Sequence, residues 1–293
     1  MLVASVNNRL TTFVGGLPVD VADASNGRFG PDIADIYDQW DDFRQWGQST
    51  GAEGGGDVAA DSLGAPSPRP SQVFAISLNY LDHAEEANLE IPDFPSVFTK
   101  FPSCIVGPNS EVELRGPTTD WEVELVVVIG RTAHRVPAAD GWDYVAGLTI
   151  GQDISDRTMQ LAGMPYPQFS VGKSLPGYGP TGPWLVTPDE LDNPDDLGLR
   201  CTLDGEVVQD FRSSKLIFSI PVLVSHLSSV VELRPGDLVF TGTSSGVGFA
   251  RSPKRFLSPG QQLVSEIEGV GTLRTQLAAS AELVGTETGG DAS

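Results

Sequence analysis

The segment from Asp120 to Gly130 constrains the fold more than any other part of the chain. It reads Asp-Trp-Glu-Val-Glu-Leu-Val-Val-Val-Ile-Gly, so two glutamates are followed by a run of branched apolar residues. Such a run is typical of a strand that is covered on both faces. Because successive side chains of a strand alternate between its faces, we expect Glu122 and Glu124 on one face, at the mouth of a buried strand.

Two ionised carboxylates in that position repel each other and lose hydration. A hard divalent cation resolves both problems, and oxygen ligands suit magnesium, manganese or calcium. Asp153 ends a second apolar strand, residues 147–153, and could supply a third carboxylate. The alternative is a pair of solvated glutamates at a strand end, since paired carboxylates are common on protein surfaces.

His83 and Glu86 stand three positions apart, which places them on one face of a short helix after Tyr80. A histidine held by a carboxylate can act as a general base that activates water. A helix-capping or surface role is the alternative for this histidine. The surrounding segment, residues 77–95, has few large apolar anchors, so we expect a lid that orders when substrate binds.

Strands dominate the chain from Ser71 onward, and the strongest hairpin signal is Asp204-Gly205 between two apolar alternating runs. A second hairpin is predicted around residues 269–271. The connections are mostly short and lack the spacing of β-α-β units, which indicates an antiparallel or mixed, β-rich domain. Helices are expected over residues 31–46, after Tyr80, near 155–162 and over 221–230.

The region of about residues 48–70 is rich in Gly, Ala, Ser and Pro and predicts a linker. We therefore expect a small β-rich N-terminal domain over residues 1–68, which includes this linker, and a larger domain over residues 69–293. The overall fold class predicted is α+β with strands in the majority.

The composition excludes several classes of protein. A formal charge of −21, from 39 acidic and 18 basic residues, repels phosphate backbones, so no nucleic-acid partner is expected. Two distant cysteines predict neither a disulfide framework nor a thiolate zinc site. No apolar run reaches the roughly 20 residues of a membrane helix, and no signal peptide is apparent, so we expect a cytoplasmic protein with no membrane partner.

Taken together, a set of short motifs resembles the fumarylacetoacetate hydrolase (FAH) family in order and spacing, from about Pro70 to Leu277. The matching stretches are Ser77–Tyr80 with His83 and Glu86, Phe98–Phe101, Glu122–Leu125, Gly151–Ser155 with Arg157, Gly172–Ser174, Gly182–Trp184, Gly236-Asp237 and Thr241–Gly248. The resemblance implies a catalytic domain built as a rolled mixed β-sheet, usually as a homodimer. It also implies one magnesium or manganese ion, with calcium also known in the family, and a small diketo or 2-oxo acid as substrate.

The resemblance implies a role for each matching residue. The metal ligands would be Glu122, Glu124 and Asp153, the catalytic residues His83, Glu86 and Lys173, and the substrate-binding residues Arg157, Gln160, Gly242 and Thr243. The chain departs from the common family pattern at Asp156-Arg157-Thr158, where many members have Ala-Arg-Asp. This departure leaves open which residue orients the arginine.

The leading functional prediction is metal-dependent hydrolysis of a C–C bond in an acylpyruvate-like or fumarylacetoacetate-like diketo acid. The enzymatic alternatives are decarboxylation of an oxaloacetate-type 2-oxo acid, and hydration or isomerisation of an unsaturated 2-oxo acid. Decarboxylation needs the metal but no water-activating base, so His83 with Glu86 favours hydrolysis. The alternative outside enzymes is a catalytically silent protein that binds a metal or ligand.

Overall fold

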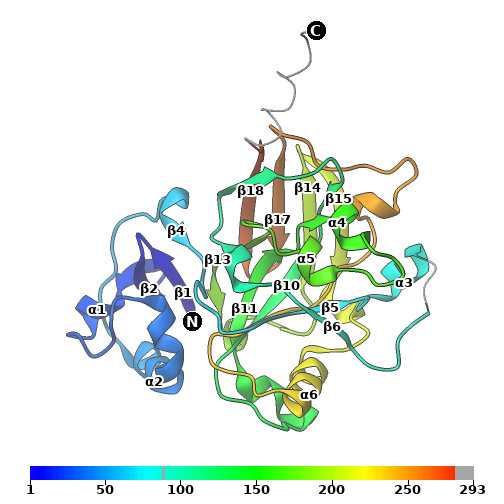
Figure 1. The fold of residues 1–293 in the computed structure, drawn as a ribbon. Helices are drawn as coiled ribbons and strands as arrows, with labels where there is room; N and C mark the ends of the chain where they lie inside the picture. The colour runs from blue at the N-terminus through cyan, green and yellow to red at the C-terminus, as the bar shows by residue number, and fades with distance from the viewer. Residues whose placement is uncertain (88–89, 281–293) are drawn as a thin grey trace.

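The computed structural model describes residues 1–87 and 90–280 (Figure 1). Residues 88 and 89 of the predicted lid, and residues 281–293 of the predicted larger domain, lie outside the described part. The strands are β1 (Leu2–Val6), β2 (Arg9–Val14), β3 (Leu17–Asp20), β4 (Leu63–Gly64), β5 (Val73–Ser77), β6 (Ser96–Thr99), β7 (Ile105–Val106), β8 (Ser110–Leu114), β9 (Thr119–Asp120), β10 (Val123–Ile129), β11 (Val145–Gln152), β12 (Ser155–Asp156), β13 (Gly179–Val186), β14 (Gly198–Leu203), β15 (Glu206–Arg212), β16 (Leu238–Phe240), β17 (Gln262–Ile267) and β18 (Gly271–Ala279).

The helices are short and lie between the strands. The α-helices are α1 (Val21–Ala24), α2 (Trp40–Ser49), α3 (Leu81–Ala87), α4 (Arg157–Leu161), α5 (Phe169–Gly172) and α6 (Ile220–Val230). The 3₁₀ turns are η1 (Ile33–Gln39), η2 (Ala60–Ser62), η3 (Pro102–Cys104), η4 (Ala138–Tyr144), η5 (Pro188–Glu190), η6 (Ser213–Lys215) and η7 (Gly248–Ala250). None of the described helices is long and apolar enough to cross a membrane.

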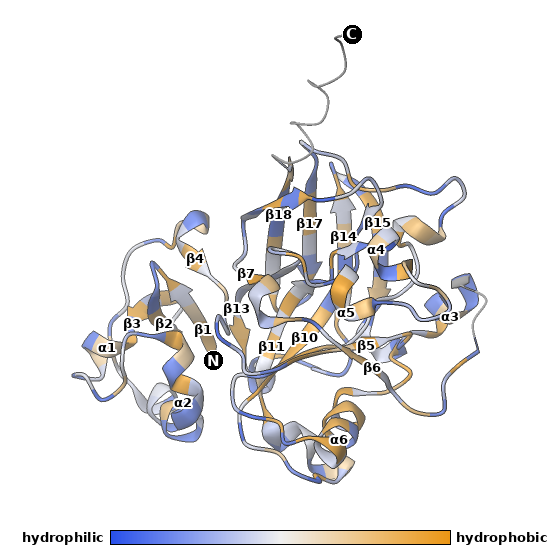
Figure 2. Ribbon diagram, viewed as in Figure 1, coloured by the Kyte–Doolittle hydropathy of each residue, from blue (hydrophilic) through white to orange (hydrophobic). Residues whose placement is uncertain are grey.

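A large mixed sheet forms the centre of the molecule, with the strand order β3-β2-β1-β13-β11-β10-β16-β5-β6. Strand β10 lies between β11 and β16 and is buried along its whole length, as its unbroken apolar run predicts. Its side chains alternate between two cores. Leu125 and Val127 belong to one hydrophobic cluster, whereas Val126 and Val128 belong to the other. Figure 2 shows hydrophobic residues along β10 and β11.

A second sheet covers one face of the first and has the order β15-β14-β17-β18-β8. The first hydrophobic cluster fills the space between the two sheets, where Leu199 and Leu263 of the second sheet pack with Leu125 and Leu148 of the first. The two predicted hairpins, β14–β15 and β17–β18, both belong to this second sheet. Most neighbouring strands run antiparallel, while β5–β16, β7–β13 and β8–β18 are parallel pairs. The predicted strand-rich α+β fold with a mixed sheet is therefore confirmed.

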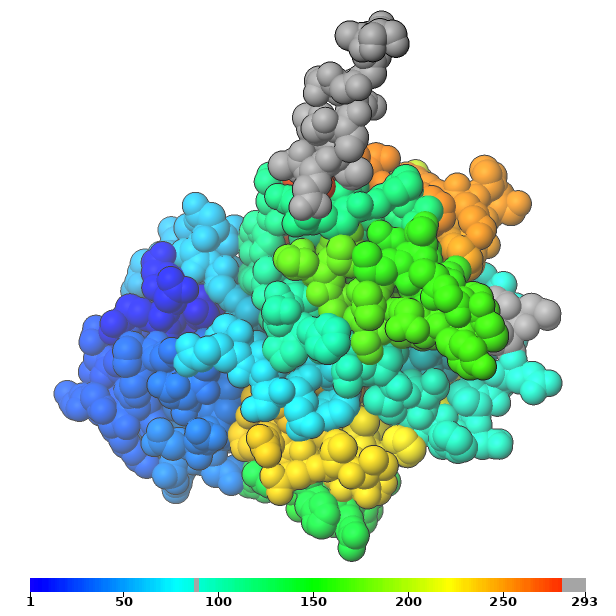
Figure 3. Space-filling view, viewed as in Figure 1, coloured from blue at the N-terminus to red at the C-terminus, as the bar shows by residue number. Residues whose placement is uncertain are grey.

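The N-terminal segment forms one end of the molecule, shown in blue in Figure 3. Its strand β1 pairs antiparallel with β13, with Leu2 opposite Val186, so it extends the central sheet. Phe29 and Phe43 pack edge to face beneath β1–β3 and help to form the second hydrophobic cluster. The division of the chain into domains near residue 69 stays a prediction.

The helix expected over residues 31–46 is divided into two pieces. Residues 33–39 form the 3₁₀ helix η1, and the α-helix α2 begins only at Trp40 and continues to Ser49. Asp32 caps η1 by accepting a hydrogen bond from the backbone N–H of Ala34 at 2.9 Å. The apolar spacing predicted a helical segment correctly, but it could not distinguish a 3₁₀ turn from an α-helix.

Candidate active site

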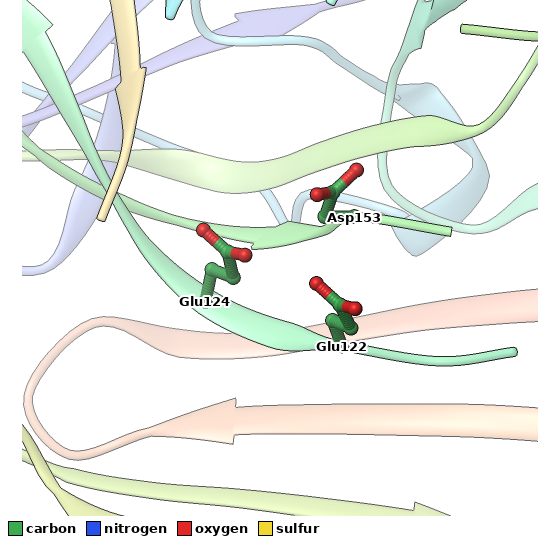
Figure 4. Close-up of side chains that lie close together, drawn as sticks. All are labelled: Glu122, Glu124 and Asp153. Carbon is green, nitrogen blue, oxygen red and sulfur yellow. The ribbon is translucent and has the colours of Figure 1, made fainter. Parts of the chain in front are cut away.

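Three carboxylates meet where β10 and β11 lie side by side. Glu122 precedes β10, Glu124 lies on it, and Asp153 directly follows β11. Val123 is opposite Gln152, and the backbone N–H of Asp153 donates to the carbonyl of Glu122 at 2.9 Å. One carboxylate oxygen from each acidic residue lies within 4.8 Å of the others. Figure 4 shows the three side chains converging from the two strands.

These carboxylates are buried, and their environments differ. Burial alone would raise the pKa of Glu122, but the charges of Lys173 and Arg157 outweigh it and lower the pKa to about 2. The pKa of Glu124 is instead well above its usual value, because of burial and the neighbouring charges of Asp153 and Glu122. Among the described residues, no lysine or arginine forms an ion pair with Glu124. Glu124 accepts a hydrogen bond from the backbone N–H of Gly242, at 2.7 Å.

A divalent cation fits this donor set. Three buried carboxylates offer only oxygen ligands, which hard cations prefer. Glu124 is a buried acid that forms no ion pair with a cation in the described part of the chain, and buried charges are normally paired or coordinated to a metal. Glu122, Glu124 and Asp153 could therefore hold such an ion, with Glu124 gaining the counter-charge that the protein does not supply.

Two buried lysines hold the triad from one side. Lys173 donates from Nζ to Glu122 at 2.8 Å and to Asp153 at 2.7 Å. Lys100 donates to the other oxygen of Asp153 at 2.6 Å and to the carbonyl oxygens of Lys173 and Tyr178. The sequence motifs predicted a role in the site for Lys173 but none for Lys100. Lys100 could have been identified from its place in the Phe98–Phe101 motif, at the end of an alternating strand.

Arg157 is oriented by Asp120, a residue that the sequence analysis did not assign to the site. The guanidinium donates from Nε and Nη2 to one oxygen of Asp120 at 2.9 and 2.7 Å, and from Nη2 to Glu122 at 2.7 Å. Its Nη1 donates to Gln160 at 2.9 Å. Asp156, which departs from the common family pattern, instead caps α4 by accepting from the N–H of Met159. Asp120 precedes Glu122 by two positions, so strand alternation could have identified it.

His83 and Glu86 lie together on α3, at the rim of the site. Nδ1 of His83 is 3.5 Å from a carboxylate oxygen of Glu86, which is longer than a normal hydrogen bond. The Glu86 carboxylate also accepts from the backbone N–H of Gly246, at 3.1 and 3.2 Å to its two oxygens. Glu86 thus connects the helix that carries His83 to the glycine-rich segment after β16.

Gly242 and Thr243 lie in that glycine-rich segment, beside β10. The Gly242 N–H is directed to Glu124, and its φ of +97° suits a residue without a side chain. Thr243 donates from its hydroxyl to the carbonyl of Val123 at 2.8 Å and accepts from Gln209 at 2.9 Å. Substrate binding by these two residues stays a prediction, whereas their observed contacts fix the position of β10.

A cavity of about 280 Å³ brings most of the predicted site residues together. Its lining includes His83, Glu86, Glu122, Arg157, Gln160, Lys173 and Thr243. A larger groove of about 650 Å³ lies between β1 and the second sheet, and its lining contains none of these residues. We place the site in the smaller cavity because it combines a member of the triad, two cations and the histidine.

Known proteins share both the sequence and the fold. Residues 72–278 match the family described as fumarylacetoacetate (FAA) hydrolase, C-terminal. The fumarylacetoacetate hydrolase domain-containing protein 2 homolog of Dictyostelium discoideum is 42% identical over 215 residues, which cover 70% of each chain. The human mitochondrial oxaloacetate tautomerase FAHD2A is 40% identical over 211 residues, which cover 71% of this chain and 67% of the human protein.

The crystal structure of a candidate HpcE protein from Mycobacterium smegmatis superimposes with a TM-score of 0.91 at 48% identity. That match covers 96% of this chain and all of the mycobacterial chain. Agreement in sequence, in fold and in the matched stretch leads to one conclusion. The chain belongs to the fumarylacetoacetate hydrolase family.

Proposed function

We propose that this protein is a divalent-cation-dependent enzyme that interconverts the keto and enol forms of a 2-oxo acid. One observation carries the proposal: Glu122 of the carboxylate triad and the His83 ring line the same small cavity. Keto–enol exchange needs a Lewis acid at the oxo group and a base near the neighbouring carbon. The human relative at 40% identity is named an oxaloacetate tautomerase, which supports this reaction class.

Glu122, Glu124 and Asp153 would hold a hard cation, magnesium or manganese. When bound there, the cation would supply a Lewis acid for the oxo group of the acid and so increase the acidity of the adjacent C–H. His83 would take that proton. Because its Nδ1 faces Glu86, the ring keeps Nε2 for exchange with a ligand in the cavity.

Lys173 and Arg157 would position the oxygens of the ligand. Lys173 has three N–H donors and gives two of them to Glu122 and Asp153, so one remains. Arg157 has five N–H donors and uses four of them on Asp120, Glu122 and Gln160. The remaining donors suit one carboxylate and one developing enolate oxygen.

Hydrolysis of a C–C bond is the second candidate, because the free ring nitrogen of His83 serves a water molecule equally well. Hydrolysis also requires stabilisation of a tetrahedral oxyanion, usually by more than one positioned donor. Here the Gly242 N–H is already bonded to Glu124, and the single N–H donors left on Lys173 and on Arg157 are the two that the head of the 2-oxo acid itself would use. The arrangement therefore supports tautomerisation more strongly than hydrolysis.

The test compares reactions on one sample. Decay of the enol absorbance of oxaloacetate and of phenylpyruvate reports tautomerisation, while pyruvate release from acetylpyruvate and from oxaloacetate reports hydrolysis and decarboxylation. We expect tautomerisation to be fastest, to stop with a chelator and to return with magnesium or manganese. Faster release of pyruvate would favour the hydrolase or the decarboxylase. A protein that binds the metal but accelerates none of these reactions would be a silent binder.

A further inference from the structure

The lining of the cavity is apolar beside its polar end. Seven apolar residues from four segments contribute to it: Ile76, Leu78, Phe98, Phe169, Val247, Phe249 and Ala250. The rings of Phe98 and Phe169 are in contact, with their centroids 5.6 Å apart. The Phe98 ring lies 5.4 Å from Nζ of Lys173, and the Phe249 ring lies 5.8 Å from the guanidinium carbon of Arg157. The apolar surface therefore begins directly beside the groups that would bind the head of a 2-oxo acid.

Charge limits what the site can neutralise. Apart from Glu86 at the rim, the charges in and around the triad include four carboxylates, Asp120, Glu122, Glu124 and Asp153. They also include three cations, Lys100, Lys173 and Arg157, which leaves a net charge of −1. A divalent cation changes this to +1, which one ligand carboxylate neutralises. A second carboxylate would be an unpaired charge in a largely apolar cavity, in a protein of net charge −21.

The cations of the lining cannot serve a second carboxylate. Lys173 and Arg157 already bind protein carboxylates and keep one N–H each. Lys254 is a further candidate, because its Nζ lies 3.5 Å from the centroid of the Phe249 ring. Its side chain is exposed and does not belong to the lining of the cavity.

We propose that the cavity selects 2-oxo acids that carry a single carboxylate and an apolar distal group, aryl or branched alkyl. The distal group rests on Phe98, Phe169 and Phe249. This assignment rests on the proposed function, since it takes the triad as the site of the chelating head. The proposed cavity would bind substituted pyruvates of this kind in preference to C4 dicarboxylates such as oxaloacetate.

Three inert oxamates test the assignment by calorimetric titration, so no turnover is needed. Oxamate is the chelating head alone, oxanilate adds a phenyl ring, and N-oxalylglycine adds a second carboxylate on an otherwise identical head. With magnesium-loaded protein, we expect oxanilate to bind at least about tenfold more tightly than either other ligand, because burial of a ring is strongly favourable. N-oxalylglycine that binds as tightly as oxanilate, or more tightly, would overturn the assignment.

Substitutions in the cavity lining show which side chains bind the distal group. Phe249→Ala and Phe98→Ala should each weaken oxanilate about tenfold and leave oxamate unchanged, which also shows that the variants fold. Phe101→Ala is the matched control, because Phe101 is 52% exposed and lies outside the cavity lining. An equal loss in Phe101→Ala would contradict the proposed subsite. Lys254→Ala should change none of the three affinities. If this variant instead lost affinity for N-oxalylglycine, the second carboxylate of that ligand would lie beside Lys254, at the rim of the cavity.

A metal-free titration separates this inference from the proposed function. Oxamate binding that needs magnesium, with the expected order of ligands, supports both. Oxamate binding that needs magnesium, with the order reversed, overturns only the distal assignment. Oxanilate that binds equally well with and without magnesium keeps the apolar subsite and contradicts the chelating head.

Discussion

Among the single residues of the site, Glu124 is the carboxylate whose charge no described lysine or arginine neutralises in an ion pair. Its neighbours Glu122 and Asp153 have buried lysine partners, whereas Glu124 has the backbone N–H of Gly242. Burial and the two neighbouring carboxylates raise its pKa well above the usual value. The folded protein without metal therefore retains a proton on Glu124 that the unfolded chain releases at lower pH.

The first prediction concerns this proton. In chelator, the free energy of unfolding should fall as the pH rises from about 4.3, the ordinary pKa of a glutamate, through the raised pKa of Glu124. The sign follows because the folded state binds more protons than the unfolded state over that range. Glu124→Gln cannot ionise, so this part of the pH dependence should disappear from urea denaturation curves. Glu266→Gln, at an exposed position of β17, is the control and should retain the slope.

The second prediction concerns the general base. His83→Ala should lower kcat for tautomerisation by about 10²–10⁴-fold, the usual scale for loss of a positioned base. Glu86→Gln should cause a smaller loss, because the imidazole remains but is less basic and less well oriented. Magnesium affinity, measured by calorimetry, should hardly change in either variant. Loss of magnesium binding in His83→Ala would show that this histidine maintains the structure of the site.

The sequence identified the acidic residues of the site more readily than the groups that hold them. Strand alternation alone placed Glu122 and Glu124 on one face, and the structure brings Asp153 to them. Asp120 and Lys100 had no assigned role, because their function depends on partners that are 37 and 53 positions away in the sequence. Alternation could have placed Asp120 on the face of Glu122, but a single sequence carries no pattern that pairs Asp120 with Arg157 or Lys100 with Asp153.

At the level of elements, Asp120 connects the start of β10 to the wall of the cavity. One oxygen accepts from the N–H of Gly248 at 2.7 Å, and the other accepts from the N–H of Phe249 at 2.9 Å and from Arg157. The 3₁₀ turn η7, which carries Phe249, is therefore held by the last residue of β9, two positions before Glu122 of the triad. This contact explains how a loop side chain can have a defined position in the site.

The third prediction follows from that contact. Asp120→Ala should lower the free energy of unfolding by about 3 kcal/mol, at the lower end for a broken buried pair, because Arg157 keeps Glu122. Hydrogen exchange of residues 246–250 should accelerate. Asp210→Ala removes an exposed partner of Arg200 and should change stability by less than about 1 kcal/mol. Equal effects of the two substitutions would contradict the role of Asp120.

The fourth prediction concerns α3, the predicted lid. Exposed or peripheral polar contacts hold this helix in place: Lys215 with Asp82 at 3.1 Å, and Glu86 with the N–H of Gly246. Because such contacts contribute little, we expect amides of residues 81–87 to exchange rapidly and to slow when oxalate and magnesium are added. The buried helix α6 should show the same exchange with and without ligand. Unchanged exchange in α3 would mean that it does not close over the site.

The sequence predicted the elements that have a strong hydrophobic period, but it predicted the boundaries of these elements less accurately. The hairpin around Asp204-Gly205 forms where it is predicted, because apolar alternation and a glycine turn are both local signals. Strand β11 begins at Val145, two residues earlier than the predicted range of 147–153, because Val145 and Ala146 are covered by the surrounding structure. Tertiary burial of this kind cannot be deduced from local propensity.

For the whole molecule, long-range strand pairing determines the architecture. Leu2 lies opposite Val186 in the central sheet, and Leu238 lies beside Val73 in a parallel pair. A hydrophobic pattern shows which faces are buried but not which distant strands meet, so the residue pattern alone predicted an antiparallel or mixed, strand-rich domain without its strand order. The family resemblance supplied the rolled topology. The homodimer that it also implies stays a prediction, which sedimentation of the purified protein can test.

The last prediction links the site to the stability of the whole chain. A cation that binds the folded triad and not the unfolded chain should stabilise the protein by about 2.7 kcal/mol at 100 times its dissociation constant. For a chain of this size, each kcal/mol corresponds to roughly 2–4 °C, so magnesium should raise Tm by about 5–10 °C relative to chelator. Glu124→Gln and Asp153→Asn should abolish the shift, because each removes one of the three buried charges that would hold the ion. The exposed Glu266→Gln control should keep the full shift, which distinguishes binding at the triad from general screening of the −21 charge. An equal magnesium shift in all these proteins would locate the stabilising ion elsewhere and would remove the basis for a metal at the triad.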